Sequence, residues 1–260
     1  HVSVALDLTK VREAEAALKR ESARRAYLLE LSDALRPLGD AAAVAREACA
    51  VLARAVGAER VVYFRIDGDD YVIDEDCAAG VGSIVGRHPV SGFGEALLAL
   101  YLSGRTAVCP DTSSEPGLSD EQRATFSALG INAYVGVPLV KDGRFVGGLA
   151  VHARSPRAWS EDDVSLAEET AHRAWEAIER VHAQQALRHS EERMRLSQDA
   201  GRVGTWDFDV AAGRMHWSEA MWSLYGREPG SSEPARVWDE ALHPDDHARV
   251  QARAKAMLQP

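Results

Sequence analysis

Two apolar runs, residues 133–140 and 144–152, lie on either side of a Lys-Asp-Gly turn and constrain the fold more than any other part of the chain. An Asp-Gly pair between such runs is a strong local signal for a β-hairpin. Both runs are rich in β-forming residues and too apolar for strands with one wet face, so we expect two central strands. A glycine pair at residues 147–148 predicts a bulge or a close approach of another backbone.

Helix and strand patterns surround this hairpin, and they predict an α+β fold with an antiparallel sheet and flanking helices. Residues 1–8 alternate like a strand, before a helix that extends to about residue 35. After the hairpin, Ser160 is a good N-cap for a helix that continues to about residue 200. Further strands are expected at residues 60–67, 71–77 and 106–109, and further helices at residues 41–56, 95–102 and 120–129.

The long helix after Ser160 carries apolar residues with alternating spacings of three and four. This heptad spacing is typical of a coiled coil, so we expect the helix to pack against a second copy of the chain. The prediction is a parallel homodimer through residues 9–35 and 160–200. The apolar positions of the repeat are Val164, Ala167, Ala171, Ala174, Ile178 and Val181.

The chain is acidic, with a net charge of −10, which argues against nucleic acid or an anionic membrane as its main partner. No apolar run reaches the roughly 18–20 residues of a membrane span. Three cysteines, far apart and without metal-ligand spacing, are typical of free thiols in a reducing compartment. We therefore expect a cytoplasmic protein with no membrane span and no nucleic-acid partner.

Two motifs that suggest chemistry have simpler explanations. Gly80, Gly82 and Gly86 have nearly the spacing of a dinucleotide-binding loop, but the third glycine comes one position late and no helix begins there, so we favour a turn. His243 and His247 are four residues apart beside carboxylates, yet no further zinc ligand is near, and a helix start explains them better. The sequence contains no catalytic motif that we can identify, so neither a catalytic residue nor a metal site is predicted.

Three segments together resemble the chromophore-binding GAF domain of phytochromes: GRHPVSGFGEALLALYLSGRTAV, ALGINAYVGVPLVKDGRFVGGLAVH and the SPRAW that follows. The resemblance covers residues 25–183 and implies a small-molecule or light-sensing domain with a ligand cavity. It also implies that His152 stands where a phytochrome histidine contacts the bilin. In the alternative interpretation, His152 only hydrogen-bonds a loop carbonyl and the aromatic residues belong to the core. The candidate ligand-binding residues are Tyr63, His88, Phe93, Tyr101, Tyr134 and His152.

The same segments depart from phytochromes at positions that hold the bilin. Phytochromes have an aspartate-isoleucine-proline after the serine, whereas Gly-Phe-Gly follows Ser91 in this chain. Related cyanobacterial photosensors have a Cys-His pair where this chain has Glu121 and Gln122. We therefore expect no covalently bound bilin, and the sequence names no other cofactor.

The two ends of the chain resemble parts of PAS domains. Residues 1–24 resemble the end of such a domain and its exit helix, and residues 201–260, with GTWDFDVAAGRMHWSEAMWSLYG, resemble the N-terminal half of another. Residues 184–200 are expected to be a linker helix. Half a PAS domain would leave the hairpin at residues 204–217 without strands to pack on, so we expect weak protection of this hairpin from hydrogen exchange.

The combined resemblance implies the sensory region of a bacterial signal-transduction protein that relays a GAF or PAS signal through dimeric helices. The implied output domain is a histidine kinase of a two-component system, with ATP-dependent phosphotransfer elsewhere in the parent chain. The alternatives are a bilin-binding photoreceptor, the input module of a diguanylate cyclase, and a structural dimerisation spacer without a ligand.

Overall fold

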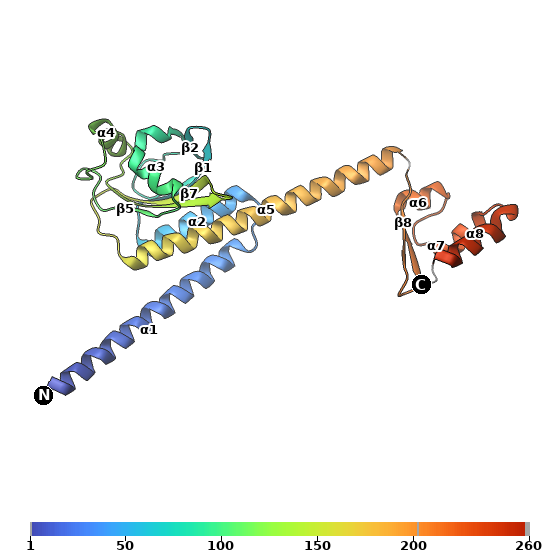
Figure 1. Ribbon diagram of the computed structural model, residues 1–260, viewed down its shortest axis with the longest axis horizontal. Helices are drawn as coiled ribbons and strands as arrows, with labels where there is room; N and C mark the ends of the chain where they lie inside the picture. Colours follow the sequence, from blue (N-terminus) through green and yellow to red (C-terminus); the bar gives the residue numbers. More distant parts are fainter. Residues whose placement is uncertain (1, 202, 258–260) are drawn as a thin grey trace. The chain divides into compact units, whose positions relative to one another are not determined.

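The computed structural model describes residues 2–201 and 203–257, and the side chains of residues 10–197 and 203–254. It contains two compact units, His1–Ala183 and Gln184–Pro260 (Figure 1). A seven-stranded sheet lies in the first unit, and a two-stranded sheet lies in the second.

The sheet of the first unit has the strand order β4-β2-β1-β7-β6-β5, and β3 pairs with β1 next to the end of β2. Every described pairing in this sheet is antiparallel, which confirms the predicted α+β class. The strands are β1 (Arg60–Asp67), β2 (Asp70–Ile73), β3 (Asp76–Ala78), β4 (Gly86–Pro89), β5 (Ala107–Cys109), β6 (Ala133–Lys141) and β7 (Arg144–Ala153).

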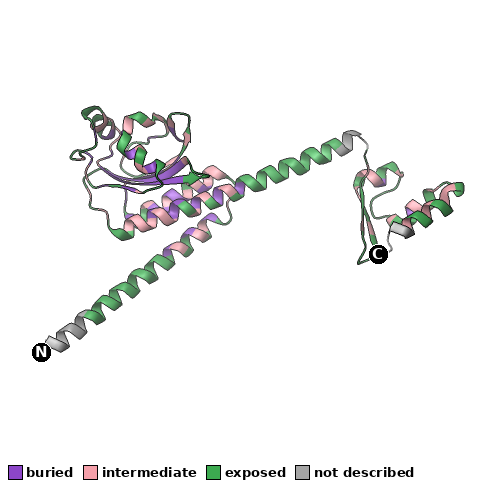
Figure 2. Cartoon of the chain, in the orientation of Figure 1, coloured by how far each residue is buried: buried purple, intermediate pink, exposed green. Residues whose placement is uncertain are grey.

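Helices cover both faces of this sheet (Figure 1). One face packs against α2, the first half of α5 and the C-terminal end of α1 through valine, leucine and alanine side chains. The opposite face packs against η1, α3 and α4 through a core rich in aromatic residues. Residues 10–26 of α1 and residues 182–197 of α5 are exposed (Figure 2). The helices of this unit are α1 (Val2–Leu35), α2 (Ala41–Val56), η1 (Val90–Phe93), α3 (Glu95–Leu102), α4 (Asp120–Ala128) and α5 (Glu161–Gly201), which continues into the second unit.

The predicted central hairpin is confirmed as strands β6 and β7. In its turn, Asp142 and Gly143 both have positive φ angles, 50° and 73°. This backbone geometry is the tight hairpin turn that Asp-Gly favours, because it matches the twist of the two strands. The register shifts between Leu139 and Val140, where the partner in β7 changes from Gly147 to Phe145, so the extra residue of the ladder is Val146 in β7, next to the glycine pair.

The glycine pair in β7 is a place of close backbone approach. A Cβ atom on Gly147 would lie 2.4 Å from the carbonyl oxygen of Phe64, in the neighbouring strand β1. A Cβ atom on Gly148 would lie 2.4 Å from the carbonyl oxygen of Val137, in β6 on the other side. The predicted close approach is therefore confirmed on both sides of the strand.

The SPRAW segment, residues 155–159, follows β7 and contacts the C-terminal end of α2. The guanidinium of Arg157 donates to the carbonyl oxygens of Val56 and Gly57 at 2.6 and 3.1 Å, where α2 ends. The same guanidinium lies 4.4 Å from the centre of the Trp159 ring, and the Trp159 indole donates to the carbonyl of Cys109 at 3.3 Å. Arg157 therefore caps the C-terminal end of α2, and the Trp159 ring covers its guanidinium.

The strand predicted at residues 1–8 is wrong, because residues 2–8 belong to α1; residue 1 lies outside the described residues. Alternation over so few residues is a weak signal. The segment that follows is rich in alanine, glutamate, lysine and arginine, all strong helix formers, and an existing helix extends more easily than a new element begins.

The heptad repeat of α5 faces the core of its own chain, which corrects the prediction that these positions contact a second copy. Ala171, Ala174 and Ile178 are buried against α1, α2 and the sheet. The hydroxyls of Tyr27 and Thr170 share a buried hydrogen bond of 2.5 Å between α1 and α5. An amphipathic helix gives the same apolar spacing whether its partner is another copy or its own sheet. The homodimer itself stays a prediction.

The strand predicted at residues 71–77 is divided into β2 and β3. Between them, the carboxylate of Asp74 pairs with Arg65 at 3.2 Å, and the carboxylate of Glu75 pairs with Arg46 of α2. Both short strands still pair with β1. The two acidic residues turn outward to their arginine partners, which interrupts the strand without removing it from the sheet.

The second unit contains the predicted hairpin, β8 (Trp206–Asp209) and β9 (Arg214–Trp217), whose edges are unpaired within the described residues. Three short helices follow: α6 (Glu219–Leu224), α7 (Pro234–Ala241) and α8 (Pro244–Met257). Pro244 begins α8, as the interpretation of the histidine motif as a helix start requires. None of the described helices is both long and apolar enough to cross a membrane.

Candidate functional site

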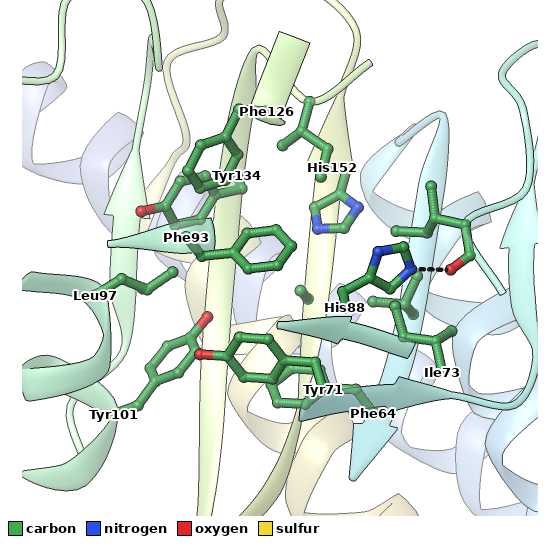
Figure 3. Close-up of a pocket in the computed structure, with 14 residues that line it drawn as sticks. Phe64, Tyr71, Ile73, His88, Phe93, Leu97, Tyr101, Phe126, Tyr134 and His152 are labelled. Atoms are coloured by element: carbon green, nitrogen blue, oxygen red, sulfur yellow. Dashed lines mark hydrogen bonds between the residues drawn. The ribbon is translucent and has the colours of Figure 1, made fainter. Parts of the chain in front are cut away.

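A small cavity of about 50 Å³ lies in the first unit between the sheet and the layer of η1, α3 and α4. It has room for a few water molecules, whereas sites for small-molecule ligands usually measure about 300–1,000 Å³. Figure 3 shows aromatic rings from both sides converging on it. Its lining consists of Val62, Phe64, Tyr71, Ile73, Ile84, His88, Phe93, Leu97, Tyr101, Phe126, Ile131, Tyr134, Ala150 and His152.

The sheet brings most of the candidate residues together at this cavity. In the register of the sheet, Tyr134 of β6 faces His152 of β7, which in turn faces Arg60 of β1. η1 supplies Phe93 and α3 supplies Tyr101 from the opposite layer. The candidates that line the cavity are His88, Phe93, Tyr101, Tyr134 and His152.

Tyr63 does not line the cavity, so its prediction as a wall residue is wrong. Its side chain packs against the opposite core, beside the helices α2 and α5. Consecutive residues of a strand point to opposite faces, and in β1 the cavity side belongs to Val62 and Phe64. The sequence places Tyr63 and Phe64 on opposite faces of the strand, but it does not say which of the two faces borders the cavity.

Several cavity residues were missed by the sequence prediction, above all Phe64, Tyr71 and Phe126. Once His152 is placed on the cavity face, the ladder also places its cross-strand neighbours there, and the alternation of β1 then selects Phe64. Phe126 lies on α4, and its ring stacks on the Tyr134 ring with centroids 5.5 Å apart. Only the position of α4 over the sheet shows this last contact.

Aromatic rings fill most of the space between the sheet and the covering layer. The Tyr71 ring meets Phe64 edge-on at 5.1 Å and Phe93 edge-on at 5.3 Å between ring centroids. Phe93 is half-buried and also meets Phe126 at 5.4 Å. Edge-to-face contacts of this kind are individually weak, about 0.5–1.5 kcal/mol beyond burial. A ligand larger than a few waters must therefore displace rings, and Phe93 is the one nearest to solvent among these four.

Two polar atoms in the cavity wall are buried without a hydrogen-bond partner among the described residues: Nδ1 of His152 and the hydroxyl of Tyr71. Their residues are only 7% and 6% exposed. A buried polar atom without a partner costs about 1–3 kcal/mol. His88, in contrast, bonds the carbonyl oxygen of Ile84 through Nε2 at 2.7 Å. The loop-carbonyl contact that was the alternative for His152 thus belongs to His88.

Burial lowers the pKa of His152 from 6.5 to about 3, and the positive charge of nearby Arg60 lowers it further in the same direction. His152 is therefore neutral at physiological pH, with a ring nitrogen available to a neutral ligand. The hydroxyl of Tyr71 also stays protonated, because burial raises its pKa. The cavity thus presents neutral hydrogen-bonding groups inside an aromatic wall.

His152 should make the folded protein sensitive to acid. Below pH 6.5 the unfolded chain takes up a proton at His152, whereas the folded chain does not do so until about pH 3. Stability is therefore lost as the pH falls through this window, at about 1.4 kcal/mol per pH unit, or about 2 kcal/mol at pH 5. The free energy of unfolding of wild type and of His152→Gln is measured in urea at both pH values. The difference between the two proteins, wild type minus variant, should fall by about 2 kcal/mol from pH 7 to pH 5. An identical difference at both pH values would contradict the buried neutral histidine.

The cysteines are not placed for covalent chemistry, and none of them lines the cavity. Burial raises the pKa of Cys109 to about 11, and its thiol donates to the Glu115 carboxylate at 3.6 Å. Burial also raises the pKa of Cys49 and Cys77. The described residues contain no cluster of histidine, cysteine and acidic side chains that could hold a metal ion. Neither a reactive thiolate nor a metal centre is thus found in the described part of the chain.

The positions of the cyanobacterial Cys-His pair have a structural use in this chain. Gln122 and Ser119 form a capping box at the start of α4, in which each side chain accepts a hydrogen bond from the backbone of the other residue, at 2.9 and 3.2 Å. Glu121 is exposed on the first turn of α4, where a negative charge is favoured. Gln122 and Glu121 therefore both stabilise the start of α4.

Comparison with known proteins agrees with this geometry. The family model of the GAF domain matches residues 40–178. The blue-light absorbing form of the Thermosynechococcus elongatus PixJ GAF domain is 22% identical, with a TM-score of 0.52 over 58% of this chain and 92% of that chain. The chromophore-binding domain of the bacteriophytochrome RpBphP3 from R. palustris is 16% identical, with a TM-score of 0.54 over 64% of each chain.

An enzyme shares the same fold. The free methionine-R-sulfoxide reductase from Neisseria meningitidis, in complex with its substrate, is 22% identical, with a TM-score of 0.50 over 64% of this chain and 93% of that chain. At such identities the likeness shows the fold alone. A comparison with curated proteins found no match.

Proposed function

Because the chain belongs to the GAF domain family, we propose that its first unit is a sensory domain whose aromatic cavity binds a small neutral ligand and reports its presence through α5. The observation that carries the proposal is the pair of buried, unpartnered polar atoms, His152 Nδ1 and the Tyr71 hydroxyl, in an otherwise apolar wall. A ligand that satisfies both recovers the cost of their burial. The fitting class is a planar, uncharged heteroaromatic molecule with both hydrogen-bond donors and acceptors.

The route from cavity to helix passes through the sheet. Tyr134 of β6 lines the cavity, and its neighbour Val135 packs on the other face in the same core as α5. The hydroxyl of Thr106, beside β5, donates to Glu168 of α5 at 2.5 Å, and Lys141 at the end of β6 bonds Glu179 of α5 at 2.5 Å. A ligand that displaces the rings would therefore shift β5 and β6, which are linked to α5 by these two hydrogen bonds.

Benzimidazole is a suitable probe, because it is planar, uncharged at neutral pH, and carries one N–H donor and one acceptor nitrogen. It should raise the melting temperature in a saturable manner, as a ligand that binds only the folded state does. Indene, which has a similar shape and no polar atom, should bind more weakly. If neither compound raises the melting temperature in a saturable manner, the domain is better explained as a structural dimerisation spacer without a ligand.

Two tyrosines on neighbouring strands, Tyr63 of β1 and Tyr71 of β2, provide matched variants for this test. Tyr71→Phe removes the unpartnered hydroxyl, so it should stabilise the free protein by about 1 kcal/mol and weaken benzimidazole binding about three- to tenfold. Tyr63→Phe removes a hydroxyl on the opposite face of the sheet and should leave binding unchanged. Equal effects of the two variants on binding would exclude the cavity as the binding site.

A bilin is the second candidate ligand, favoured by the resemblance that places His152 at the histidine contacting the bilin in phytochromes. The small cavity and the absence of a cysteine from its lining oppose this candidate. We expect no covalent adduct after coexpression with a bilin-producing pathway, as measured by zinc fluorescence on a denaturing gel. A fluorescent band that disappears in Cys109→Ala would overturn this expectation, and a new absorbance band with added biliverdin would favour noncovalent binding.

The wider context of the domain rests on the resemblances at its two ends. The proposal is a cytoplasmic sensor protein in which PAS-like segments flank the GAF domain, and in which a homodimer relays the signal to a histidine kinase of a two-component system. Three exposed apolar residues of α5 beyond the core support a contact with a second copy: Leu187, Met194 and Leu196. A diguanylate cyclase as the output domain is the alternative, and the sequence after Pro260 in the parent gene distinguishes the two.

A further inference from the structure

A second hollow of the first unit has a different chemical character from the aromatic cavity. This groove has a volume of about 580 Å³ and lies between the loop before β4 and the turn that follows α4. Two arginines, two serines and an asparagine line it, and no acidic residue is part of its lining. The polar residues are Arg60, Arg154, Ser83, Ser127 and Asn132.

Arg60 is the central residue of the groove, and its charge lacks a close counterion. The side chain is 1% exposed, and two of its nitrogens donate to one carbonyl oxygen, that of Leu129, at 2.9 and 3.0 Å. Its Nε has no partner among the described residues. Asp76 is the nearest acidic influence, but its carboxylate accepts the backbone N–H of Ile84 at 2.7 Å and forms no described ion pair with Arg60. Buried charges in proteins are normally paired, so this guanidinium has capacity for an anion.

The rest of the lining supplies further donors. Arg154 is exposed, and its guanidinium has no polar partner in the described part of the chain. The hydroxyl oxygen of Ser83 accepts the N–H of Val85 at 3.2 Å, which leaves its own O–H free to donate. Gly80, with a φ of 73°, and Gly82 expose the backbone of the loop on the same side. Exposed amides of such a loop together with guanidinium groups are a typical environment for phosphate.

We infer that this groove binds the phosphate group of a small phosphorylated molecule, with Arg60 and Arg154 as its cationic ligands. The glycine loop, explained as a turn from the sequence, then also serves as part of the anion site. Ile84 lines both the groove and the aromatic cavity, but the two sites require opposite ligand chemistry. The inference therefore goes beyond the proposed function and does not depend on it.

The test is a titration of the 260-residue chain with inorganic phosphate at constant ionic strength, followed by ¹H–¹⁵N NMR. The amides of Gly80, Gly82 and Gly130 should shift in a saturable manner, because they lie in the lining of the groove. Acetate, as a carboxylate probe, should bind at least about fivefold more weakly, because it offers fewer acceptor oxygens to two guanidinium groups. Acetate binding as tight as that of phosphate, or no saturable shift at these glycines, would overturn the inference.

Two exposed arginines make a matched pair for this titration. Arg154→Gln should weaken phosphate binding about tenfold, because one charge-assisted contact is lost. Arg144→Gln removes the same charge from the β6–β7 hairpin, outside the groove, and should change the affinity less than about twofold. Equal losses in the two variants would mean that phosphate is attracted only by overall charge, and the site would be rejected.

Discussion

Replacement of Gly148 by alanine should destabilise the first unit by about 3 kcal/mol or more, since forced overpacking of a rigid core is among the costly substitutions. The added Cβ would lie 2.4 Å from the carbonyl oxygen of Val137 and 2.5 Å from the Phe64 ring. The first of these atoms belongs to the backbone of a central strand, and the second to a ring that is packed against other rings. Neither can move without opening the sheet or the cavity. Urea unfolding followed by circular dichroism measures the loss.

Gly82→Ala is the control for this substitution. Gly82 has no heavy atom within 4 Å of an added Cβ, and its φ is not in the left-handed region. Its replacement should change the stability by less than about 0.5 kcal/mol, as at other unconstrained surface positions. If Gly148→Ala is as stable as Gly82→Ala, the close packing of β7 between β1 and β6 is incorrect.

Ile178→Glu should unfold the first unit or reduce its stability by about 3 kcal/mol or more, because it places a carboxylate in the core. Ile178 is 6% exposed and belongs to the core between α5, α1, α2 and the sheet. If the heptad repeat instead lay between two copies, the same variant would yield a folded monomer. Urea unfolding together with light scattering distinguishes these outcomes.

Leu187→Glu is the matched control on the same helix. Leu187 is 59% exposed, so a charge there should leave the stability of the first unit unchanged. In the proposed homodimer, this variant should weaken association, because Leu187 belongs to the apolar positions that remain for a partner. A well-folded Ile178→Glu monomer beside an unaffected Leu187→Glu dimer would restore the original interpretation of the heptad repeat.

Much of the fold follows from short-range signals in the sequence. The Asp-Gly turn, the N-cap at Ser160 and the glycine pair in β7 each act within a few residues of themselves, so they could be identified without knowledge of the packing. The strand predicted at residues 1–8 failed for the complementary reason. Its alternation is local as well, but the stronger helical preference of the following residues overrides it.

The partner of an apolar face is the part that the sequence does not specify. The repeat of α5 predicts an apolar stripe correctly, yet the identity of the covering surface depends on the loop that returns α5 to the sheet. The same difficulty explains Tyr63 and Phe64, since strand periodicity assigns them to opposite faces without saying which face holds the cavity. Phe126 and the groove of Arg60 depend on contacts between distant segments and were therefore not predicted.

Amide hydrogen exchange across α5, with and without saturating benzimidazole, tests most directly whether the cavity is sensed by this helix. Residues 161–181 pack on the sheet through the core that also contains Val135, so ligand binding should change their exchange rates. Tyr71→Phe at the same ligand concentration should show a smaller change, because less ligand is bound. A saturable rise in melting temperature together with unchanged exchange over residues 161–181 would contradict transmission of the signal to α5. The cavity would then bind its ligand without any effect on the helix.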